Sequence, residues 1–419
     1  MIKNHTMRPE VLEKYLASKV HTKADKNKIL TIKPEFNREL ELGVEKEKLF
    51  NYMRPTLEVE TNTLHVFPGK DYAEHYKLIY DQLGYQTQVI EGESLPETVK
   101  NIIPELPNID VVVLGYVEAF VNKDSWEGNN FVKYQIKHYG LTTVAYVGVA
   151  FSYWGDISYF VVKELSKYTD SFIYFGKLGS MLPEAVPNKH LATGKLSYIE
   201  ETNETFEFES PFNFQDFNEV LVGNHVTLSS PVKETKSWVE DNSQYHFVDP
   251  EIGWMAKACA DNGKQFSYLH LISDSLVFDF EENLSFEPKY SREAALLLGK
   301  SLIINYFYNY HSPVKSVYTA QLKRVTSGIL PPLEQNWPLA LSFLHHTLEE
   351  VVEVIRELPR KEWKDQEVNP DRVLEEMADV YIQFLTAMFY TGFTKEDLDS
   401  ALYFKLTQTK NRKDWKDSK

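Results

Sequence analysis

Two uninterrupted apolar runs constrain the fold of this chain more than any other feature of its sequence. They are VVVLGYV at 111–117 and TVAYVGVA at 143–150. A strand that is buried on both faces reads as a continuous apolar run, and such strands lie in sheets that helices cover on both sides. The two runs therefore predict an α/β domain with a central parallel or mixed sheet and flanking helices.

The surrounding sequence supports the same prediction, because short apolar strands alternate with amphipathic helices from residue 56 to residue 311. The predicted strands are 86–90, 110–117, 142–149, 171–175, 219–222 and 266–272. The predicted helices are 71–83, 156–168 and 252–262. We assign residues 56–311 to the α/β domain, and residues 1–55, which are charged and weakly patterned, to an N-terminal extension.

A segment with turn and breaker signals follows the α/β region. Residues 312–336 contain Ser-Pro, Ser-Gly and Pro-Pro, which indicate a linker. After it every segment has helical periodicity, so residues 337–419 are predicted to form an all-α helical-bundle domain. A chain of 419 residues is long for one domain, and a multi-domain chain is the natural expectation.

Composition excludes several classes of protein. The formal net charge of -16 argues against nucleic acid or an anionic membrane as a partner. Cys259 is the only cysteine, which excludes an internal disulfide and a thiolate zinc site. No apolar run approaches the roughly 20 residues that span a bilayer, and the first residues lack the apolar core of a signal peptide. We therefore expect a cytoplasmic protein that binds neither nucleic acid nor membranes.

Two helical segments near the C-terminus are rich in carboxylates. Glu349, Glu350 and Glu353 share one predicted helix, and Glu376 with Asp379 share one face of the next. Carboxylates beside an apolar stripe repel one another unless a cation neutralises them. A hard cation such as Mg²⁺ takes oxygen ligands and retains waters for catalysis, so the five residues predict a metal site. The alternative is that both are solvated helix faces.

The two acidic segments match EExxE, a spacer and ExxD, and here the region resembles the MazG-like and dimeric dUTPase superfamily of all-α nucleotide pyrophosphohydrolases. The resemblance implies Mg²⁺-dependent cleavage of a (deoxy)nucleoside triphosphate to monophosphate and pyrophosphate, with Mn²⁺ as an alternative cofactor. It also implies a catalytic carboxylate that orients the attacking water, which we assign to Glu350. A further match, with residues that would hold the departing phosphates, is formed by Lys405, Lys410, Asn411 and Arg412. These basic residues are alternatively a solvated helix end.

The segment from Phe247 to Leu276 carries a second set of acidic residues. Asp249 and Glu251 open a predicted helix, and Asp274 follows a buried strand. An Asp at the carboxyl end of a core strand stands where α/β folds place ligand-contacting groups. Taken alone, Asp274 is equally a cap or turn residue.

Glu251 and Asp274 are 23 positions apart, and this spacing resembles the nucleoside phosphorylase/nucleosidase superfamily, which has V-E-M-E followed by S-D. The resemblance implies a phosphorylase-like domain in which Glu251 binds the ribose hydroxyls and Asp274 gives a proton to N7 of a departing purine. The segment from His225 to Ser230, with Glu234, stands where that superfamily lines its base and sugar pocket. The substrate-binding residues that the resemblance implies are Gly176, Gly179 and Ser180 of a Gly-rich turn, Asp249 and Ser229.

One departure from that superfamily bears on the nucleophile. No arginine occurs between Arg54 and Arg292, whereas the guanidinium fork is the usual clamp for a phosphate ion. This absence favours water as the nucleophile, and hence a nucleosidase. An arginine from another subunit, or Arg38, would be the alternative clamp.

The sequence thus predicts a bifunctional hydrolase of nucleotide substrates that cleaves (d)NTP in the C-terminal domain. The α/β domain would cleave the N-glycosidic bond of a purine nucleotide or nucleoside, for phage defence or pool control. One alternative is an α/β domain that senses nucleotides without cleaving them and regulates the pyrophosphohydrolase. A second is a C-terminal domain that serves only as a structural interaction module.

We also expect a homo-oligomer, either a dimer or a larger assembly. The helix YIQFLTAMFY, from Tyr381 to Tyr390, has more apolar surface than a small helical domain can bury alone. The resemblance adds that relatives of both domains commonly pair subunits to complete their sites.

Overall fold

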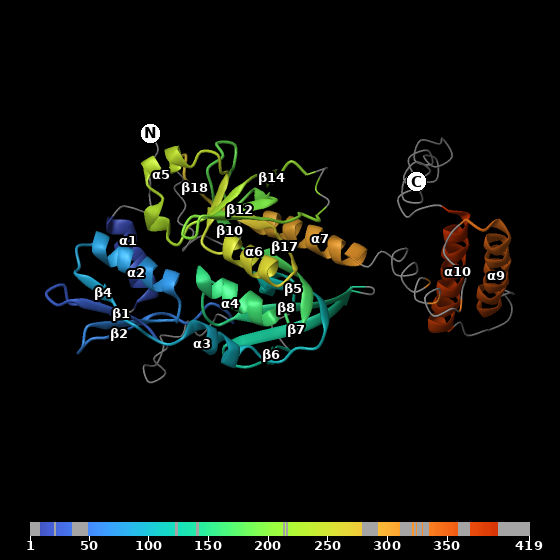
Figure 1. Cartoon of the computed structure of the whole chain (residues 1–419), viewed down its shortest axis with the longest axis horizontal. Coiled ribbons are helices and arrows are strands. Elements are labelled where there is room, and N and C mark those ends of the chain that lie inside the picture. The colour runs from blue at the N-terminus through green and yellow to red at the C-terminus, as the bar shows by residue number, and fades with distance from the viewer. Residues whose placement is uncertain are drawn as a thin grey trace. The chain divides into compact units, whose positions relative to one another are not determined.

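The chain forms two compact units, Met1–Tyr308 and Asn309–Lys419. The computed structural model in Figure 1 describes residues 9–20, 22–35, 49–121, 125–139, 142–212, 214, 217–278, 292–310, 321, 324, 329, 335–358 and 369–392. The first unit is α/β with mixed sheets and the second is helical, which confirms the predicted fold class. No helix in the described part of the chain has the length and apolar character that crossing a membrane requires.

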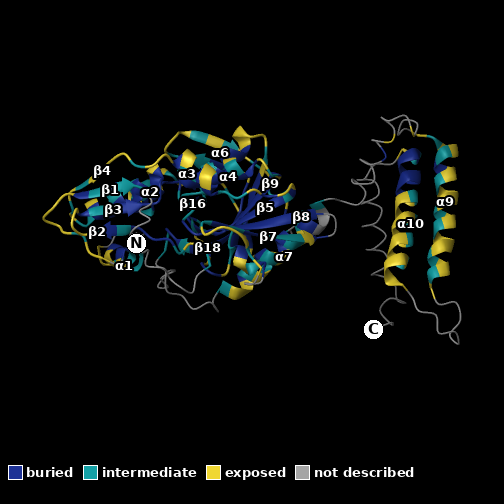
Figure 2. Ribbon diagram, turned by 90° about the horizontal axis from the view of Figure 1, so that it is seen from below, coloured by how far each residue is buried: buried dark blue, intermediate teal, exposed yellow. Residues whose placement is uncertain are grey.

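The two apolar runs form the centre of a six-stranded sheet. Its strands, in the order β17-β9-β5-β8-β7-β6, are β17 (Gln265–Tyr268), β9 (Thr169–Phe175), β5 (Ile109–Gly115), β8 (Thr142–Val149), β7 (Val132–Tyr139) and β6 (Glu127–Gly128). The first four are parallel, and β7 and β6 join them antiparallel. Figure 2 shows β5 and β8 as buried strands, as their continuous apolar sequences predict.

Helices cover this sheet on both faces. On one face Val112 and Leu114 belong to the same buried cluster as the apolar residues of α4 (Asp156–Leu165) and α6 (Ile252–Asp261). On the other face Tyr146 meets Phe307 of α7 (Glu293–Tyr310) with ring centroids 6.4 Å apart. The other described helices of this unit are α1 (Pro9–Lys19), α2 (Lys70–Gln82), α3 (Leu95–Ile102), α5 (Lys236–Asp241) and the 3-10 turns η2 (Val117–Ala119) and η3 (Pro231–Lys233).

An eight-stranded mixed sheet carries most of the predicted site. Its strands, in the order β13-β12-β15-β16-β10-β18-β11-β14, are β13 (Glu204–Glu207), β12 (Leu196–Ile199), β15 (His225–Thr227), β16 (Phe247–Asp249), β10 (Lys177–Ser180), β18 (His270–Ser275), β11 (Leu191–Thr193) and β14 (Val220–Val222). The chain passes between the two sheets at Gly176 and at Leu269, which separate β9 from β10 and β17 from β18. The predicted strand 266–272 is therefore two strands, one in each sheet.

The assignment of residues 1–55 to an extension is wrong for 9–34, which form α1 and β1 (Leu30–Pro34) of a third sheet. That sheet has the order β2-β3-β1-β4 and includes β2 (Thr56–Glu58), β3 (Thr63–Val66) and β4 (Thr87–Val89). Leu30 and Ile32 are fully buried, and Leu12 and Leu16 of α1 join the core. The segment LTIK alternates over only four residues inside a charged stretch, which is too short for periodicity to show a strand.

The second unit pairs α9 (Trp337–Glu357) with α10 (Pro370–Thr391). The side chain of Asn369 caps α10 by accepting the backbone N–H groups of Asp371 and Arg372. Gly392 ends the helix in the left-handed conformation, at φ 87°. Asn369 and Gly392 therefore set the start and the end of α10.

Candidate functional site

Neighbouring strands of the eight-stranded sheet bring predicted site residues together. Gly179 of β10 lies opposite Val248 of β16 on one side and opposite Asp274 of β18 on the other. Strand β15 adjoins the far side of β16, where Thr227 lies opposite Asp249. Because neighbouring strands lie about 4.8 Å apart, roughly 10 Å separates the backbones of β16 and β18. A small organic ligand spans that separation.

Protein groups hold the side chain of Asp249, which gives it a positioning role. Its carboxylate is buried, and Oδ1 accepts the backbone N–H groups of Glu251 at 2.9 Å and Ile252 at 2.8 Å. It thereby caps the first turn of α6 and fixes the backbone that carries Glu251. Its two oxygens also face two imidazoles, His225 Nε2 at 3.3 Å and His270 Nε2 at 3.7 Å. Burial raises the pKa of Asp249, but these imidazoles and backbone donors outweigh it and hold the pKa below its ordinary value.

The two histidines are fully buried polar groups inside the sheet. The backbone N–H of Gly176 donates to His270 Nδ1 at 3.3 Å, so the neutral ring carries its proton on Nε2, which faces Asp249. Burial lowers the pKa of His270 to about 4. His225 Nδ1 lies 2.8 Å from Ser197 Oγ. A histidine in the apolar strand YLHLIS is the only sequence signal for this network, and it indicates a core histidine without naming its partner.

Glu251 stands at the N-terminus of α6 and is half-buried. Burial, followed by the negative charge of Asp249, raises the pKa of Glu251 well above its ordinary value. The raised pKa favours the protonated form of Glu251, in which the carboxyl can both donate and accept hydrogen bonds. The charge of Glu251 in turn raises the pKa of the buried phenol Tyr174, after the larger effect of burial.

A second carboxyl with a raised pKa, that of Glu234, is influenced by the charge of Asp274. Glu234 follows η3 and is only 8% exposed. Burial, and then the charge of Asp274, raises the pKa of Glu234 well above its ordinary value. The backbone N–H of Ser275 donates to Asp274 Oδ1 at 2.8 Å, which orients the Asp274 carboxyl. The site thus places a proton-holding acid next to Asp274, a pairing that no spacing along the chain reveals.

The Gly-rich segment is a strand, and the predicted turn is wrong. Residues Lys177–Ser180 form β10, with a register shift between Leu178 and Gly179. Just before β10, a Cβ on Gly176 would lie 2.9 Å from His270 Nε2, so packing restricts that position to glycine unless the buried imidazole moves. A Cβ on Gly179 would lie 2.9 Å from Leu276 Cδ1, at the end of a flexible side chain that can turn away. Ser180 is fully buried, and its Oγ accepts the N–H of Leu182.

Ser229 is also buried and is held by protein groups. Its N–H donates to Glu201 Oε1 at 2.7 Å, and its Oγ accepts Lys233 Nζ at 2.7 Å. Its carbonyl oxygen accepts the indole N–H of Trp154 at 2.8 Å. These bonds fix the start of η3, and with it Glu234, against the loop that follows β8.

The helical unit brings carboxylates of both helices together. One oxygen from each of Glu350, Glu353 and Glu376 lies within 4.8 Å of the other two. Partial burial, and then the charges of Asp379 and Glu353, raise the pKa of Glu350. Desolvation and then Glu353 raise the pKa of Glu376. Hard oxygen donors that repel one another in this way fit a hard divalent cation.

Glu349 departs from this cluster. Its Oε2 lies 2.9 Å from His346 Nδ1, and both side chains are more than half exposed. Adjacent helical residues point about 100° apart, so Glu349 and Glu350 do not face the same neighbour. The predicted phosphate-holding residues, Lys405, Lys410, Asn411 and Arg412, lie outside the described residues, as does Arg38.

The protonated carboxyls predict a decrease of stability at alkaline pH. Because the folded pKa values of Glu234 and Glu251 exceed the unfolded value of 4.5, the folded state binds more protons and stability falls as pH rises above 4.5. His270 acts oppositely, but only between about 4 and 6.5. We therefore expect the free energy of unfolding of the α/β unit to fall from pH 6.5 to 8.5, by up to about 1.4 kcal/mol per pH unit for each carboxyl. The Tm of the unit should fall with it.

Differential scanning calorimetry at pH 6.5, 7.5 and 8.5 measures this slope. Glu234→Gln removes one of the two carboxyls and should reduce the slope, whereas the exposed control Glu240→Gln should leave it unchanged. A Tm that is constant or rises over this interval contradicts the protonated state of both groups.

No family model matches this chain, and no curated protein matches it. Solved structures that match include a 5'-methylthioadenosine/S-adenosyl homocysteine nucleosidase from Campylobacter jejuni, at 11% identity and a TM-score of 0.39, over 48% of this chain and 99% of that one. Purine nucleoside phosphorylase from Toxoplasma gondii matches at 12% identity and a TM-score of 0.39, over 50% of this chain and 93% of that one. A futalosine hydrolase mutant from Helicobacter pylori matches at 13% identity and a TM-score of 0.36, over 46% of this chain and 98% of that one. We draw no activity from likenesses of this size.

Proposed function

We propose that this chain is a bifunctional hydrolase that degrades nucleotides. The helical unit converts a (deoxy)nucleoside triphosphate to the monophosphate and pyrophosphate, and the α/β unit cleaves the N-glycosidic bond of a purine nucleotide or nucleoside. The observation that carries the proposal is the pairing of acids in each unit, Glu234 with Asp274 and Glu350 with Glu353 and Glu376. A cytoplasmic homo-oligomer, with a role in phage defence or pool control, is part of the same proposal.

In the α/β unit the leaving base must receive a proton as the bond to the sugar breaks. Water adds to C1′ and releases one proton to solvent, the C1′–N9 bond breaks, and its electron pair goes to the purine, which takes a proton at N7 from Asp274. The proton that Glu234 holds beside Asp274 is available to restore that acid. Glu251, as a neutral carboxyl, can both donate to and accept from the sugar hydroxyls. Asp249 keeps Glu251 in place through the α6 cap.

In the helical unit Glu350, Glu353, Glu376 and Asp379 would hold Mg²⁺ or Mn²⁺, which supplies a Lewis acid for the substrate phosphates when it is bound. The raised pKa of Glu350 suits a carboxylate that accepts a proton from the attacking water near neutral pH. That water bonds to the α-phosphorus, and pyrophosphate leaves with the bridging oxygen.

A panel of ribo- and deoxyribonucleotides, nucleoside monophosphates and nucleosides tests both halves. Each is incubated with the full chain, with Mg²⁺ or with EDTA, and the products are separated by chromatography. We expect pyrophosphate only with the metal, and free base with or without it. Nucleotide that binds but never yields free base would replace the glycosidase with the sensor alternative. Pyrophosphate release that EDTA leaves unchanged would remove the metal assignment.

A further inference from the structure

The start of α6, which carries Glu251, is held by side chains of the neighbouring strands β15 and β16. Asp249 Oδ1 accepts the backbone N–H groups of Glu251 at 2.9 Å and Ile252 at 2.8 Å. Thr227 Oγ1 accepts the next N–H group along the chain, that of Gly253, at 2.7 Å. The first N–H groups of a helix have no partner within the helix, and here three in succession are satisfied by protein side chains. The group that this turn offers to a ligand is therefore the side chain of Glu251.

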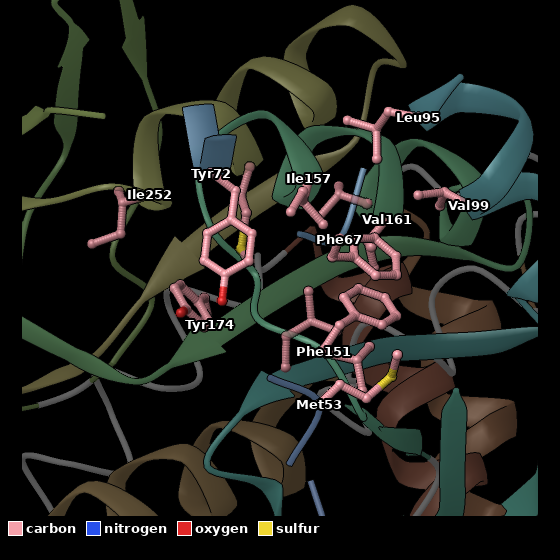
Figure 3. Close-up of a cluster of buried hydrophobic side chains, with 14 of the residues drawn as sticks. Met53, Phe67, Tyr72, Leu95, Val99, Phe151, Ile157, Val161, Tyr174 and Ile252 are labelled. Atoms are coloured by element: carbon pink, nitrogen blue, oxygen red, sulfur yellow. The ribbon is translucent and has the colours of Figure 1, made fainter. Parts of the chain in front are cut away.

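Packing fixes the same turn from other directions. Ile252 is fully buried and belongs to the hydrophobic cluster that Figure 3 shows. Ser158 Oγ of α4 donates to the carbonyl oxygen of Glu251 at 3.3 Å. A Cβ on Gly253 would lie 2.6 Å from Thr227 Oγ1, so glycine permits the close approach that this hydrogen bond needs. The backbone of Glu251 is thus fixed by its neighbours before any ligand arrives.

One residue, His225 of β15, connects the two side chains that hold this turn. Its Nε2 lies 3.3 Å from Asp249 Oδ1. Its Nδ1 lies 2.8 Å from Ser197 Oγ, which in turn lies 3.3 Å from Thr227 Oγ1. His225, Ser197 and Thr227 are all completely buried, so the imidazole acts through these neighbours and not by touching a ligand itself.

One arrangement of hydrogens gives each of these links a donor and an acceptor. Thr227 Oγ1 accepts the N–H of Gly253, so the Thr227 hydroxyl is free to donate to Ser197 Oγ. The Ser197 hydroxyl then donates to His225 Nδ1, and the imidazole carries its proton on Nε2, toward Asp249. The carboxylate of Asp249 only accepts, which completes the sequence. The network therefore begins and ends on the first turn of α6.

Asp249 depends on His225 to compensate its buried charge. Burial raises the pKa of Asp249, and His225 contributes most to lowering it again. His270 Nε2 is farther away, 3.7 Å from Asp249 Oδ2, which is beyond the usual hydrogen-bond distance. A buried carboxylate without a partner is costly. Loss of the His225 imidazole should therefore disturb the bond from Asp249 to the N–H of Glu251, and with it the placement of Glu251.

We propose that His225 is a positioning residue for Glu251 and that it thereby sets a preference of the α/β unit for ribose over 2′-deoxyribose. This inference rests on the proposed glycosidic cleavage, in which Glu251 binds the sugar hydroxyls. A carboxyl has two oxygens, so a correctly placed Glu251 can bond both the 2′- and the 3′-hydroxyl. A site built to bond a hydroxyl discriminates against the analogue that lacks it. Displacement of Glu251 removes that discrimination, while the rest of the site still acts on both sugars.

Two substitutions of His225 separate its two links. Gln places its amide near the position of Nε2 and can still donate to Asp249, whereas Asn places its amide near Nδ1 and reaches only Ser197. His225→Asn should lower kcat/KM for ribose substrates 10- to 30-fold, mainly through KM, and that for 2′-deoxyribose substrates less than 3-fold. His225→Gln should stay within 3-fold of the unmodified chain for both, because Asp249 holds Glu251 directly. His138→Asn, which changes an exposed imidazole of β7, is the matched control and should alter neither value.

Base release is measured with the full chain on AMP and dAMP, and on adenosine and 2′-deoxyadenosine. We expect the unmodified chain to prefer the ribose member of each pair that it cleaves at least 10-fold. Glu251→Ala should remove this preference, and His225→Asn added to Glu251→Ala should change the ratio no further, because both act on one contact. If far-UV circular dichroism shows that His225→Asn does not fold, Thr227→Val tests the same network. It removes the hydroxyl that holds α6, with an expected 3- to 10-fold loss on ribose substrates alone.

The inference and the proposed function fail in distinguishable ways. An unmodified chain that cleaves both sugars equally well overturns the inference and leaves the glycosidase in place. A folded His225→Asn variant that slows both sugars by the same factor, or that keeps the ribose preference, also overturns it. If no substrate releases base, the glycosidase proposal fails, and calorimetric titration decides the inference. Adenosine that binds at least 10-fold more tightly than 2′-deoxyadenosine, and loses this advantage in His225→Asn, supports it, and equal affinities overturn it.

Discussion

Glu350→Gln should lower the rate of metal-dependent pyrophosphate release at least 100-fold and leave the release of free base unchanged. The variant replaces one carboxylate with a neutral amide, in a cluster in which carboxylate oxygens of α9 and α10 lie within 4.8 Å of one another. It removes both a ligand for the cation and the carboxylate that we assign to the attacking water, and a positioned base alone contributes about 10²–10⁴-fold. EDTA should produce the same loss in the unmodified chain.

The same substitution should have opposite effects on stability with and without the cation. Without Mg²⁺, Glu350 is repelled by Asp379, Glu353 and Glu349, so Glu350→Gln should raise the Tm of the helical unit. With Mg²⁺, the unmodified site gains binding free energy that the variant loses, and the order of the two Tm values should reverse. Glu375→Gln, an exposed neighbour on the same helix, is the matched control and should change neither activity nor Tm. Tm values that keep the same order under both conditions contradict a cation site at these residues.

The metal site illustrates what spacing along a chain determines. Spacings of three and four residues place Glu350 with Glu353, and Glu376 with Asp379, on one face of each helix. Spacing does not determine which faces of two helices meet. For this reason the five predicted ligands do not all lie together in the structure, which groups Glu350, Glu353 and Glu376. Glu349 lies one position from Glu350, points to another side of α9, and faces His346.

In the α/β unit, prediction succeeded where burial imposes a pattern on the sequence. Strands β5 and β8 are apolar on both faces because helices cover both, so their sequences alone identify them. Prediction failed where a residue's role depends on a distant neighbour. The sequence places Gly179 in a turn, and only the pairing of β10 with β16 and β18 shows that it belongs to a strand. Arg54 is isolated in the sequence, and only the fold brings it into one pocket with His65 and Phe151.

Asp274→Asn should lower the release of free base at least 1000-fold while pyrophosphate release stays within 2-fold of the unmodified chain. An amide holds no transferable proton, so the departing purine would leave as an anion, and loss of a general acid costs about 10²–10⁴-fold. Asp170→Asn is the matched control, because Asp170 is an exposed aspartate paired with Lys264 in the same unit. Chromatography of both products in one reaction measures base release beside pyrophosphate release, and the far-UV circular dichroism of the variant checks that the α/β unit is folded.

Glu234→Gln distinguishes the contribution of Glu234 to base release from that of Asp274. Burial, and then the charge of Asp274, raises the pKa of Glu234, so base release should fall as pH rises through the raised pKa of Glu234. Glu234→Gln should reduce base release about 10- to 100-fold and remove that alkaline decrease, because the variant lacks the carboxyl whose proton is lost as pH rises. Base release that Asp274→Asn leaves unchanged would show that the α/β unit does not cleave through this acid. An alkaline decrease that survives Glu234→Gln would assign the titrating group to Glu251, the other carboxyl of this site whose pKa burial raises.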